Sequence, residues 1–147
     1  MVEPHVVVTK FTIPPLRTHL LPRSPLIERL NQGCKLPFVL LSASAGSGKT
    51  TLLAAWASLY SHPVAWLSLD SLDNDPLRFW SAIMVALRMY FPSPGEEAFT
   101  SLHSSASPNL IAFLALLIND LSTVGEEITL IIDDYHMIEE PAIHSSL

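Results

Sequence analysis

The sequence predicts an α/β fold in which helices flank a parallel sheet. An apolar run at residues 37–41 is followed by a glycine-bearing loop and then by an apolar, alanine-rich segment from Leu52 to Trp56. A second short apolar run, Ile128 to Ile132, is rich in β-branched residues and ends in two aspartates. Between these runs, apolar residues recur at helical spacing, at Leu77, Trp80, Met84 and Leu87. Buried strands that alternate with amphipathic helices are typical of this fold class.

The chain begins with a proline-rich stretch, residues 1–23, for which we expect an extended lead-in. Ser24 and Pro25 are typical of an N-cap and a first helical residue, and Gly33 can end the helix that they start, Pro25 to about Gln32. The other expected elements are a strand at Phe38–Ser42, a helix at Lys49–Tyr60, a strand at Val64–Leu69, a helix from Asp75-Pro76 to about Tyr90, a Ser/Pro-rich loop at Pro92–Pro108, a helix from Ser107-Pro108 to about Ser122 and a strand at Ile128–Ile132.

Residues 43–51 read A-S-A-G-S-G-K-T-T and join the first expected strand to the helix that follows it. Strand, glycine-bearing loop and helix in this order are the context of a phosphate-binding P-loop. Gly46 and Gly48 can adopt backbone angles closed to other residues, which brings main-chain N–H groups close to phosphate oxygens. We therefore expect a P-loop NTPase in which Lys49 reaches the β- and γ-phosphates of ATP and the Thr50 hydroxyl is a ligand of Mg²⁺.

The whole loop is the candidate cofactor-binding segment, namely Ala43, Ser44, Ala45, Gly46, Ser47, Gly48, Lys49, Thr50 and Thr51. The full pattern G-x-x-x-x-G-K-[ST] begins with glycine, and this chain has Ala43 at that position. The structural alternative is a Gly/Ser turn before a helix with an exposed lysine. The apolar segments on either side favour the P-loop.

The second half of the expected site follows the last strand. Asp133 and Asp134 come at the C-terminal end of the run Ile128 to Ile132, and open α/β sheets bind ligands at that end of their strands. Asp133 is therefore the candidate for the Mg²⁺ shell, and Asp134 is placed to orient or deprotonate a water that attacks the γ-phosphate. Lys49 and Asp134 are the expected catalytic residues. The alternative is an ordinary strand end at which two aspartates begin a turn.

Several segments in the same order resemble one family of regulators. The lead-in carries T-K-F at residues 9–11 and L-L-P-R-S-P-L-I-E-R-L at residues 20–30, and the loop is similar to A-P-A-G-[YF]-G-K-T-T, which also begins with alanine. A-W-L-S-L-D at residues 65–70, D-N-D-P-L-R-F at residues 73–79 and L-I-I-D-D-Y-H at residues 130–136 complete the set. Over nearly its whole length the chain therefore resembles MalT-type, LuxR-family transcriptional activators.

This resemblance implies a signal-transduction ATPase of the STAND class. In that family ATP and an inducer drive self-association, and a C-terminal helix-turn-helix binds DNA. The expected domains are the lead-in, residues 1–23, and a partial P-loop NTPase domain with about three core strands, residues 24–147. The winged-helix, sensor and DNA-binding regions would follow in a longer protein, so the inducer, DNA and self-association partners are expected to bind there. The resemblance also places the neighbourhood of Arg23 beside the adenine.

The composition fits a single cytoplasmic domain. The 147 residues are 49% hydrophobic, which can supply a sizeable core, and the formal net charge is −6. No cluster of lysines and arginines is present in the sequence, so we expect no contact with nucleic acid from this region. The longest apolar run, Leu110 to Ile118, is too short to span a bilayer. The single Cys34 fits a reducing compartment, and the spacing of the six histidines predicts no zinc site.

Two other functions stay open. A P-loop small-molecule kinase needs an arginine-rich lid, and only Arg78 and Arg88 follow the loop. The second open function is that of a module that binds the nucleotide and does not hydrolyse it.

His136 also has two interpretations. It is either a neighbour of the γ-phosphate or a residue that holds a turn.

We also expect these residues by themselves to be a poor folder and a negligible ATPase. In related ATPases a fourth strand lies between the P-loop strand and the strand that ends in the aspartates. Only 13 residues follow Asp134 here, too few for a crossover and another strand.

Overall fold

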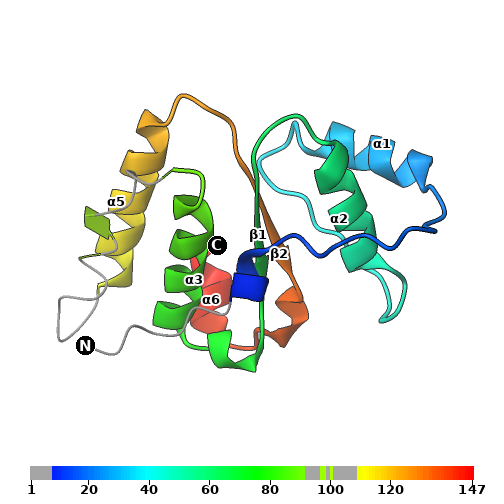
Figure 1. Cartoon of the computed structure of the whole chain (residues 1–147). Coiled ribbons are helices and arrows are strands. Elements are labelled where there is room, and N and C mark those ends of the chain that lie inside the picture. The colour runs from blue at the N-terminus through cyan, green and yellow to red at the C-terminus, as the bar shows by residue number, and fades with distance from the viewer. Residues whose placement is uncertain (1–7, 92–96, 99, 101–108) are drawn as a thin grey trace.

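The computed structural model describes residues 8–91, 97–98, 100 and 109–147. Its strands, β1 (Val64–Ser68) and β2 (Thr129–Asp133), pair in parallel. The helices are α1 (Ser24–Gly33), α2 (Lys49–Leu59), α3 (Pro76–Arg88), α5 (Leu110–Thr123) and α6 (Pro141–Ser146), and the short 3-10 turns are η1 (Val8–Phe11), η2 (Ser71–Asp73) and η3 (Tyr135–Met137). The predicted α/β class, a parallel sheet with flanking helices, is confirmed (Figure 1).

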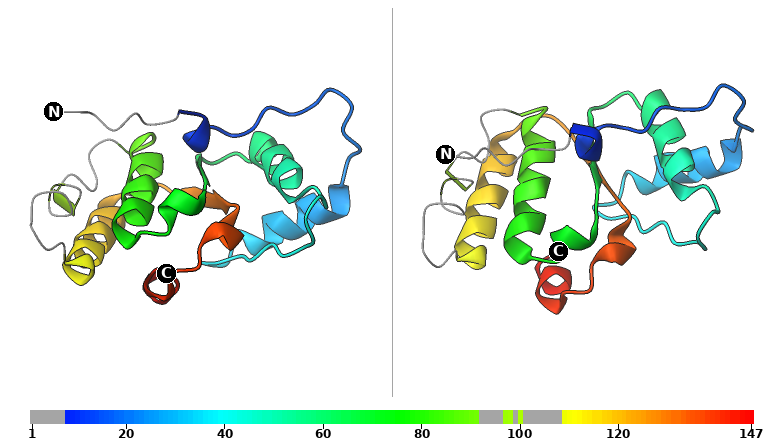
Figure 2. Two further views of the ribbon diagram at one scale, coloured as in Figure 1. Left: turned by 90° about the horizontal axis from the view of Figure 1, so that it is seen from below. Right: turned by 60° about the horizontal axis from the view of Figure 1, so that its bottom comes forward.

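Helices cover both faces of the sheet. The group α3, α5 and α6 lies on one side of the strands, and α1 and α2 lie on the other side (Figure 1 and Figure 2). One buried apolar cluster joins Ala65 and Leu67 of β1 to the first group of helices. A second cluster joins Val64 and Trp66 of β1 to α1, α2 and Ile131. Alternate residues of β1 thus point into opposite layers, as the twofold repeat of a strand requires.

The first three helices begin and end close to where the sequence predicts. At the start of α3, Asp75 Oδ1 accepts a hydrogen bond from the N–H of Arg78 (2.9 Å), and Pro76 occupies the first turn. The bounds of α1, α2 and α3 differ from the predicted ones by no more than two residues at either end, which is the usual uncertainty of helix ends. The predicted N-cap Ser24 is wrong, because Ser24 is the first residue of α1 and Arg23 precedes it without a side-chain capping bond. The helix α2 also begins without one, so of these three helices only α3 has the side-chain cap that the sequence predicts.

The start of α5 differs from the prediction. Asn109 is its N-cap, and the Asn109 side chain accepts hydrogen bonds from two N–H groups of the first turn (both 3.1 Å). The predicted start, Ser107 and Pro108, lies outside the described residues.

Within the described residues, no helix is both long and apolar enough to cross a membrane.

The loop predicted for Pro92 to Pro108 lies mostly outside the described residues. Glu97, Ala98 and Thr100 are described, and their backbone is helical. Ala98 is fully buried in the cluster that contains α3. This stretch is therefore not a loop throughout, because an apolar side chain within it contributes to the core.

The register of the sheet brings the C-terminal ends of both strands together. Paired residues run from Val64 opposite Thr129 to Ser68 opposite Asp133. The ladder continues past β1, where the N–H of Leu69 donates to the carbonyl oxygen of Asp133 (3.1 Å). Asp133 therefore lies at the C-terminal end of the strands, which is where α/β proteins bind their ligands.

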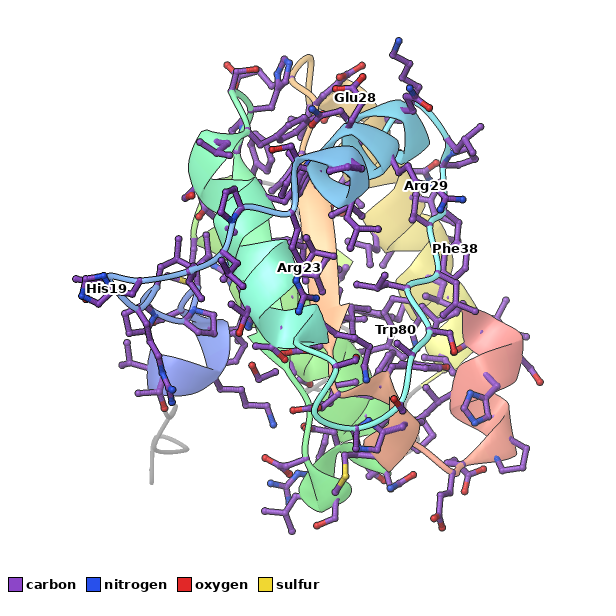
Figure 3. All side chains as sticks on the ribbon, turned by 90° about the vertical axis from the view of Figure 1, so that its right-hand side faces the viewer. His19, Arg23, Glu28, Arg29, Phe38 and Trp80 are labelled. Carbon is purple, nitrogen blue, oxygen red and sulfur yellow. The ribbon has the colours of Figure 1, made fainter. Side chains whose placement is uncertain are left out.

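The strand predicted at Phe38–Ser42 does not form. In the described part of the chain, this segment pairs with neither β1 nor β2. Phe38 and Leu40 are 70% and 72% exposed, whereas Leu41 packs partly against the cluster around α2. Figure 3 shows Phe38 on this outer segment. A strand needs a hydrogen-bonded neighbour, and no described segment supplies one here, so the sheet has two strands and not the three expected.

The lead-in is anchored to the turn that follows β1. Phe11 is buried in the α3 cluster, and Lys10 Nζ donates to the carboxylates of Asp70 (3.0 Å) and Asp73. Asp73 is only 3% exposed. Burial alone would raise the pKa of Asp70, but the hydrogen bonds from Lys10 and from the N–H of Leu72 outweigh it and hold this pKa below its ordinary value of 3.8. The network fixes η1 beside β1.

We expect Phe38→Lys in the 147-residue chain to change the free energy of unfolding by less than about 0.5 kcal/mol, because the Phe38 side chain is mostly exposed. The added charge should also reduce self-association, which exposed apolar surface promotes. Urea denaturation and light scattering measure the two effects. The contrasting variant is Ala65→Lys, since Ala65 is fully buried and the charge there should prevent folding. A large loss of stability in Phe38→Lys would contradict the exposed position.

Candidate functional site

The predicted loop leads into the N-terminal end of α2. Gly46 (φ 76°) and Gly48 (φ 83°) both occupy the left-handed region, which other residues rarely adopt. No hydrogen bond within the described part of the chain uses the N–H of Gly46, Gly48, Lys49 or Thr50. Two of these N–H groups belong to the first turn of α2, where the helix dipole adds partial positive charge. Unpaired donors at a helix N-terminus are suited to bind phosphate.

The ammonium group of Lys49 folds back onto the loop. Its Nζ donates to the carbonyl oxygens of Ala43 (2.7 Å) and Ser44 (3.0 Å). These bonds place a positive charge beside the unpaired N–H donors. Ala43 is exposed and does not have a positive φ, so the loop does not need the glycine that the full pattern has at this position.

The hydroxyl of Thr50 contacts the carboxylate of Asp133. Thr50 Oγ1 donates to Asp133 Oδ2 (2.7 Å), although 83 residues separate the two in sequence. Asp133 is 7% exposed, and its Oδ1 accepts the N–H of Asp134 (3.0 Å). A hydroxyl and a carboxylate are oxygen ligands of the kind that Mg²⁺ prefers. The structure thus brings the two predicted metal ligands into contact.

Asp134 has an unusual backbone conformation. Among the described non-glycine residues, it is the only one with a positive φ (58°). Aspartate tolerates this region better than most residues do, and such strained positions are common at functional sites. The Asp134 side chain is 51% exposed. Its carboxylate is therefore accessible to water at the end of β2.

His136 lies beside this carboxylate. Its Nδ1 is 3.8 Å from Asp134 Oδ1, and both side chains are largely exposed. Within the described residues His136 makes no other polar side-chain contact, and this contact lies inside the turn that begins at Asp134. The neighbouring Tyr135 hydroxyl is instead hydrogen-bonded to Nδ1 of His144 (2.6 Å), and burial raises the pKa of Tyr135.

Arg23 connects the lead-in to the loop. Its Nη1 donates to the carbonyl oxygen of Ser47 (2.9 Å). The guanidinium also lies against Gly48, where an added Cβ would be 3.3 Å from Nη2. Figure 3 shows the Arg23 side chain beside the N-terminal end of α2. The sequence associated Arg23 with a nucleotide only through the family resemblance, because nothing local to residue 23 indicates this contact.

A hollow of about 210 Å³ lies between the lead-in and α2. It is lined by Pro14, Pro15, Leu16, Arg17, Leu20, Thr50, Thr51 and Ala54. The walls are apolar on the side of the prolines and polar at the two threonines. Sequence reasoning did not find this hollow, since it needs both the path of the lead-in and the position of α2.

The predicted site residues occupy one connected region. Thr50, Asp133 and Asp134 are joined by hydrogen bonds, and Lys49 contacts the start of the loop. Ser47 accepts the bond from Arg23 through its carbonyl, and its own hydroxyl is buried without a partner in the described chain. Thr51 lines the hollow, and Ala45 is exposed in the turn before Gly46.

Comparison with known proteins agrees with the motifs. The chain is 38% identical over 129 residues to the HTH-type transcriptional regulator MalT of Serratia proteamaculans, 36% over 127 residues to that of Yersinia enterocolitica and 35% over 127 residues to that of Yersinia pestis. Each match covers 85% of this chain. The chain is a relative of the MalT-type regulators. No family model matches it.

The resemblance to MalT-type activators, which the motifs indicated, is thereby confirmed. The chain spans 14% of the length of these MalT relatives. What the whole regulators do therefore does not follow for this chain from the match. A function for the 147 residues has to be argued from their own site.

We expect Thr50→Val to lower the free energy of unfolding by about 1.5–3 kcal/mol, the usual contribution of a hydrogen bond to a charged group. Valine keeps the shape of threonine and removes the donor to the buried Asp133 Oδ2. Thr50→Ser keeps the hydroxyl and is the matched control. Urea denaturation of the three proteins measures the difference. Equal stability of the valine and serine variants would mean that this hydrogen bond is absent in solution.

Proposed function

We propose that this chain is the ATP-binding switch module of a MalT-type transcriptional regulator. The observation that carries the proposal is the 2.7 Å hydrogen bond between Thr50 and Asp133. It joins the end of a glycine-bearing loop to the end of a buried strand, which is how P-loop NTPases combine their two conserved motifs. The α/β fold and the relationship to MalT support the same assignment.

The loop and the lead-in together account for nucleotide binding. The Lys49 ammonium and the unpaired N–H groups of four loop residues would bind the phosphates. These residues are Gly46, Gly48, Lys49 and Thr50. The hollow between the lead-in and α2 is adjacent, since Thr50 and Thr51 form one of its walls. Its proline-rich side is suited to an apolar, planar base. Arg23 would keep the loop in this shape through its bond to Ser47.

Thr50 and Asp133 would hold Mg²⁺, and their donor set fits the ion. Both ligands are oxygens, and the Asp133 carboxylate lies at the sheet edge with Thr50 in contact. Mg²⁺ is usually bound through one or two carboxylates, waters and substrate phosphates, so these two side chains suffice from the protein. When bound, the ion neutralises charge on the β- and γ-phosphate oxygens.

Asp134 would act on the attacking water. Its carboxylate is half exposed and lies next to the metal ligand in sequence. The carboxylate can orient a water or accept its proton as the water attacks the γ-phosphorus and the bond to ADP breaks. Slow turnover of this kind would reset the switch. The inducer, self-association and DNA contacts of the regulator are proposed to involve regions outside these residues.

We expect Lys49→Ala to weaken ATP binding strongly in the full-length gene product. The variant loses a charge-assisted contact to phosphate worth about 1.5–3 kcal/mol, or roughly ten- to hundredfold in affinity. Equilibrium binding of a fluorescent ATP analogue measures this loss. Lys35→Ala removes an equal charge from the end of α1 and is the control. An unchanged affinity in Lys49→Ala would rule out the P-loop assignment.

Asp133→Asn and Asp134→Asn should separate binding from turnover. The first should weaken Mg²⁺-dependent ATP binding, since it removes a ligand charge. The second should leave binding intact and slow single turnover by roughly 10²- to 10⁴-fold, the usual range for a general base. Equal loss of binding in both variants would contradict the two roles. Binding without turnover by the wild type would favour a module that only binds nucleotide, and phosphate transfer to an added small molecule would favour a kinase.

A further inference from the structure

One side chain between η2 and α3 ties together two turns that are far apart in sequence. Asn74 Nδ2 donates to the carbonyl oxygen of Met137 (2.5 Å), and Asn74 Oδ1 accepts the N–H groups of Glu139 (2.6 Å) and Glu140 (3.1 Å). These contacts join positions 63 to 66 residues apart. An asparagine amide has two N–H donors and one oxygen that can accept two hydrogen bonds. Asn74 therefore uses most of its hydrogen-bonding groups on this one segment.

The segment that Asn74 holds comes directly after Asp134. The backbone turns sharply at Asp134, forms η3, and then reaches Ile138, which is 4% exposed in the core cluster. Two hydrogen bonds close η3: Met137 N–H donates to Asp134 O (2.9 Å) and Ile138 N–H to Tyr135 O (3.0 Å). The left-handed conformation of Asp134 is unfavourable by itself. Its position therefore depends on the contacts that fix the residues after it.

Asn74 is itself held rigidly. The preceding residue, Asp73, is buried, and its carboxylate accepts hydrogen bonds from Asp70 N–H (2.8 Å) and from Lys10. The following residue, Asp75, caps α3. Because both neighbours are fixed, the Asn74 amide presents its donors and acceptor in one orientation. Views from two directions place η2 next to η3 at the same end of the sheet (Figure 2).

We propose that Asn74 is a positioning residue for Asp134. It touches no reacting group, and it acts by fixing the turn η3 and the residues after it, which keeps the Asp134 carboxylate at the end of β2. Asp133 does not depend on this contact, since the β1–β2 ladder and Thr50 hold it. Loss of the Asn74 amide should therefore slow the turnover that depends on Asp134 and leave the affinity for the nucleotide unchanged. This consequence for turnover rests on the proposed function.

The test compares Asn74→Ala with Asn109→Ala in the full-length gene product. Both changes remove an amide whose oxygen accepts two backbone N–H groups, so similar losses of stability are expected. Asn109 caps α5, which lies on the far side of α3 from the strands (Figure 1). Asn74→Asp is the conservative variant, because its carboxylate keeps the two accepted bonds. It replaces the donor to Met137 with an oxygen that repels the Met137 carbonyl, so only a partial recovery is expected.

Three measurements decide the outcome: ATP affinity, the single-turnover rate, and hydrogen exchange of individual backbone amides. Asn74→Ala should slow turnover by roughly ten- to hundredfold, the effect of a small misplacement of a catalytic group, with ATP affinity within about twofold of wild type. Asn109→Ala should leave both values unchanged, and Asn74→Asp should recover part of the rate. An equal loss of turnover in Asn74→Ala and Asn109→Ala, or an unchanged rate in Asn74→Ala, would overturn the proposal.

Hydrogen exchange tests the proposal independently of ATP. In Asn74→Ala the amides of Glu139 and Glu140 should exchange faster, and so should those of Met137 and Ile138, which close η3. Faster exchange confined to Glu139 and Glu140 would overturn the proposal, because the turn at Asp134 would then not depend on Asn74. If the wild type binds no ATP, the proposed function fails, and the exchange at Met137 and Ile138 still decides the role of Asn74.

Discussion

The hydrogen bond between Thr50 and Asp133 is the contact on which the site depends. Asp133 is a nearly buried carboxylate, and burying such a group is unfavourable unless its oxygens are hydrogen-bonded. One oxygen accepts the Thr50 hydroxyl and the other accepts the N–H of Asp134. The start of α2, the end of β2 and the turn at Asp134 are therefore mutually constrained. A shift of α2 or of the turn at Asp134 would leave one of the two carboxylate oxygens without a partner.

The two strands of the sheet differ in how far they are buried. Four of the five residues of β1 are buried, since α2 and α3 cover its faces and η1 lies along its outer side. The strand β2 is less buried, and in the described chain only β1 pairs with it. Phe38 and Leu40 stay exposed next to the layer that contains α2. The burial that stabilises this sheet thus comes mainly from β1.

The segment D-N-D at residues 73–75 consists of polar residues that each make a different structural contact. Asp73 holds Lys10 of the lead-in, Asn74 holds the residues after Asp134, and Asp75 caps α3. Sequence reasoning recognised this segment as part of a family motif and placed the start of a helix at Asp75-Pro76, because helix starts have local signals. The other two side chains act across about 60 residues, and no periodicity or local pattern reports such a contact.

The sequence by itself determined the class of fold, three helices and two strands to within a few residues, and the positions of the glycine-bearing loop and of the aspartate pair. Each of these depends on local chemistry: apolar periodicity, capping, and glycines where the backbone needs a positive φ. Only the tertiary structure decided that Phe38–Ser42 has no partner strand, that Thr50 meets Asp133, and that Arg23 contacts the loop. These outcomes depend on which segments the packing brings side by side, because hydrogen bonds between distant residues form only where the fold holds their atoms within about 3 Å.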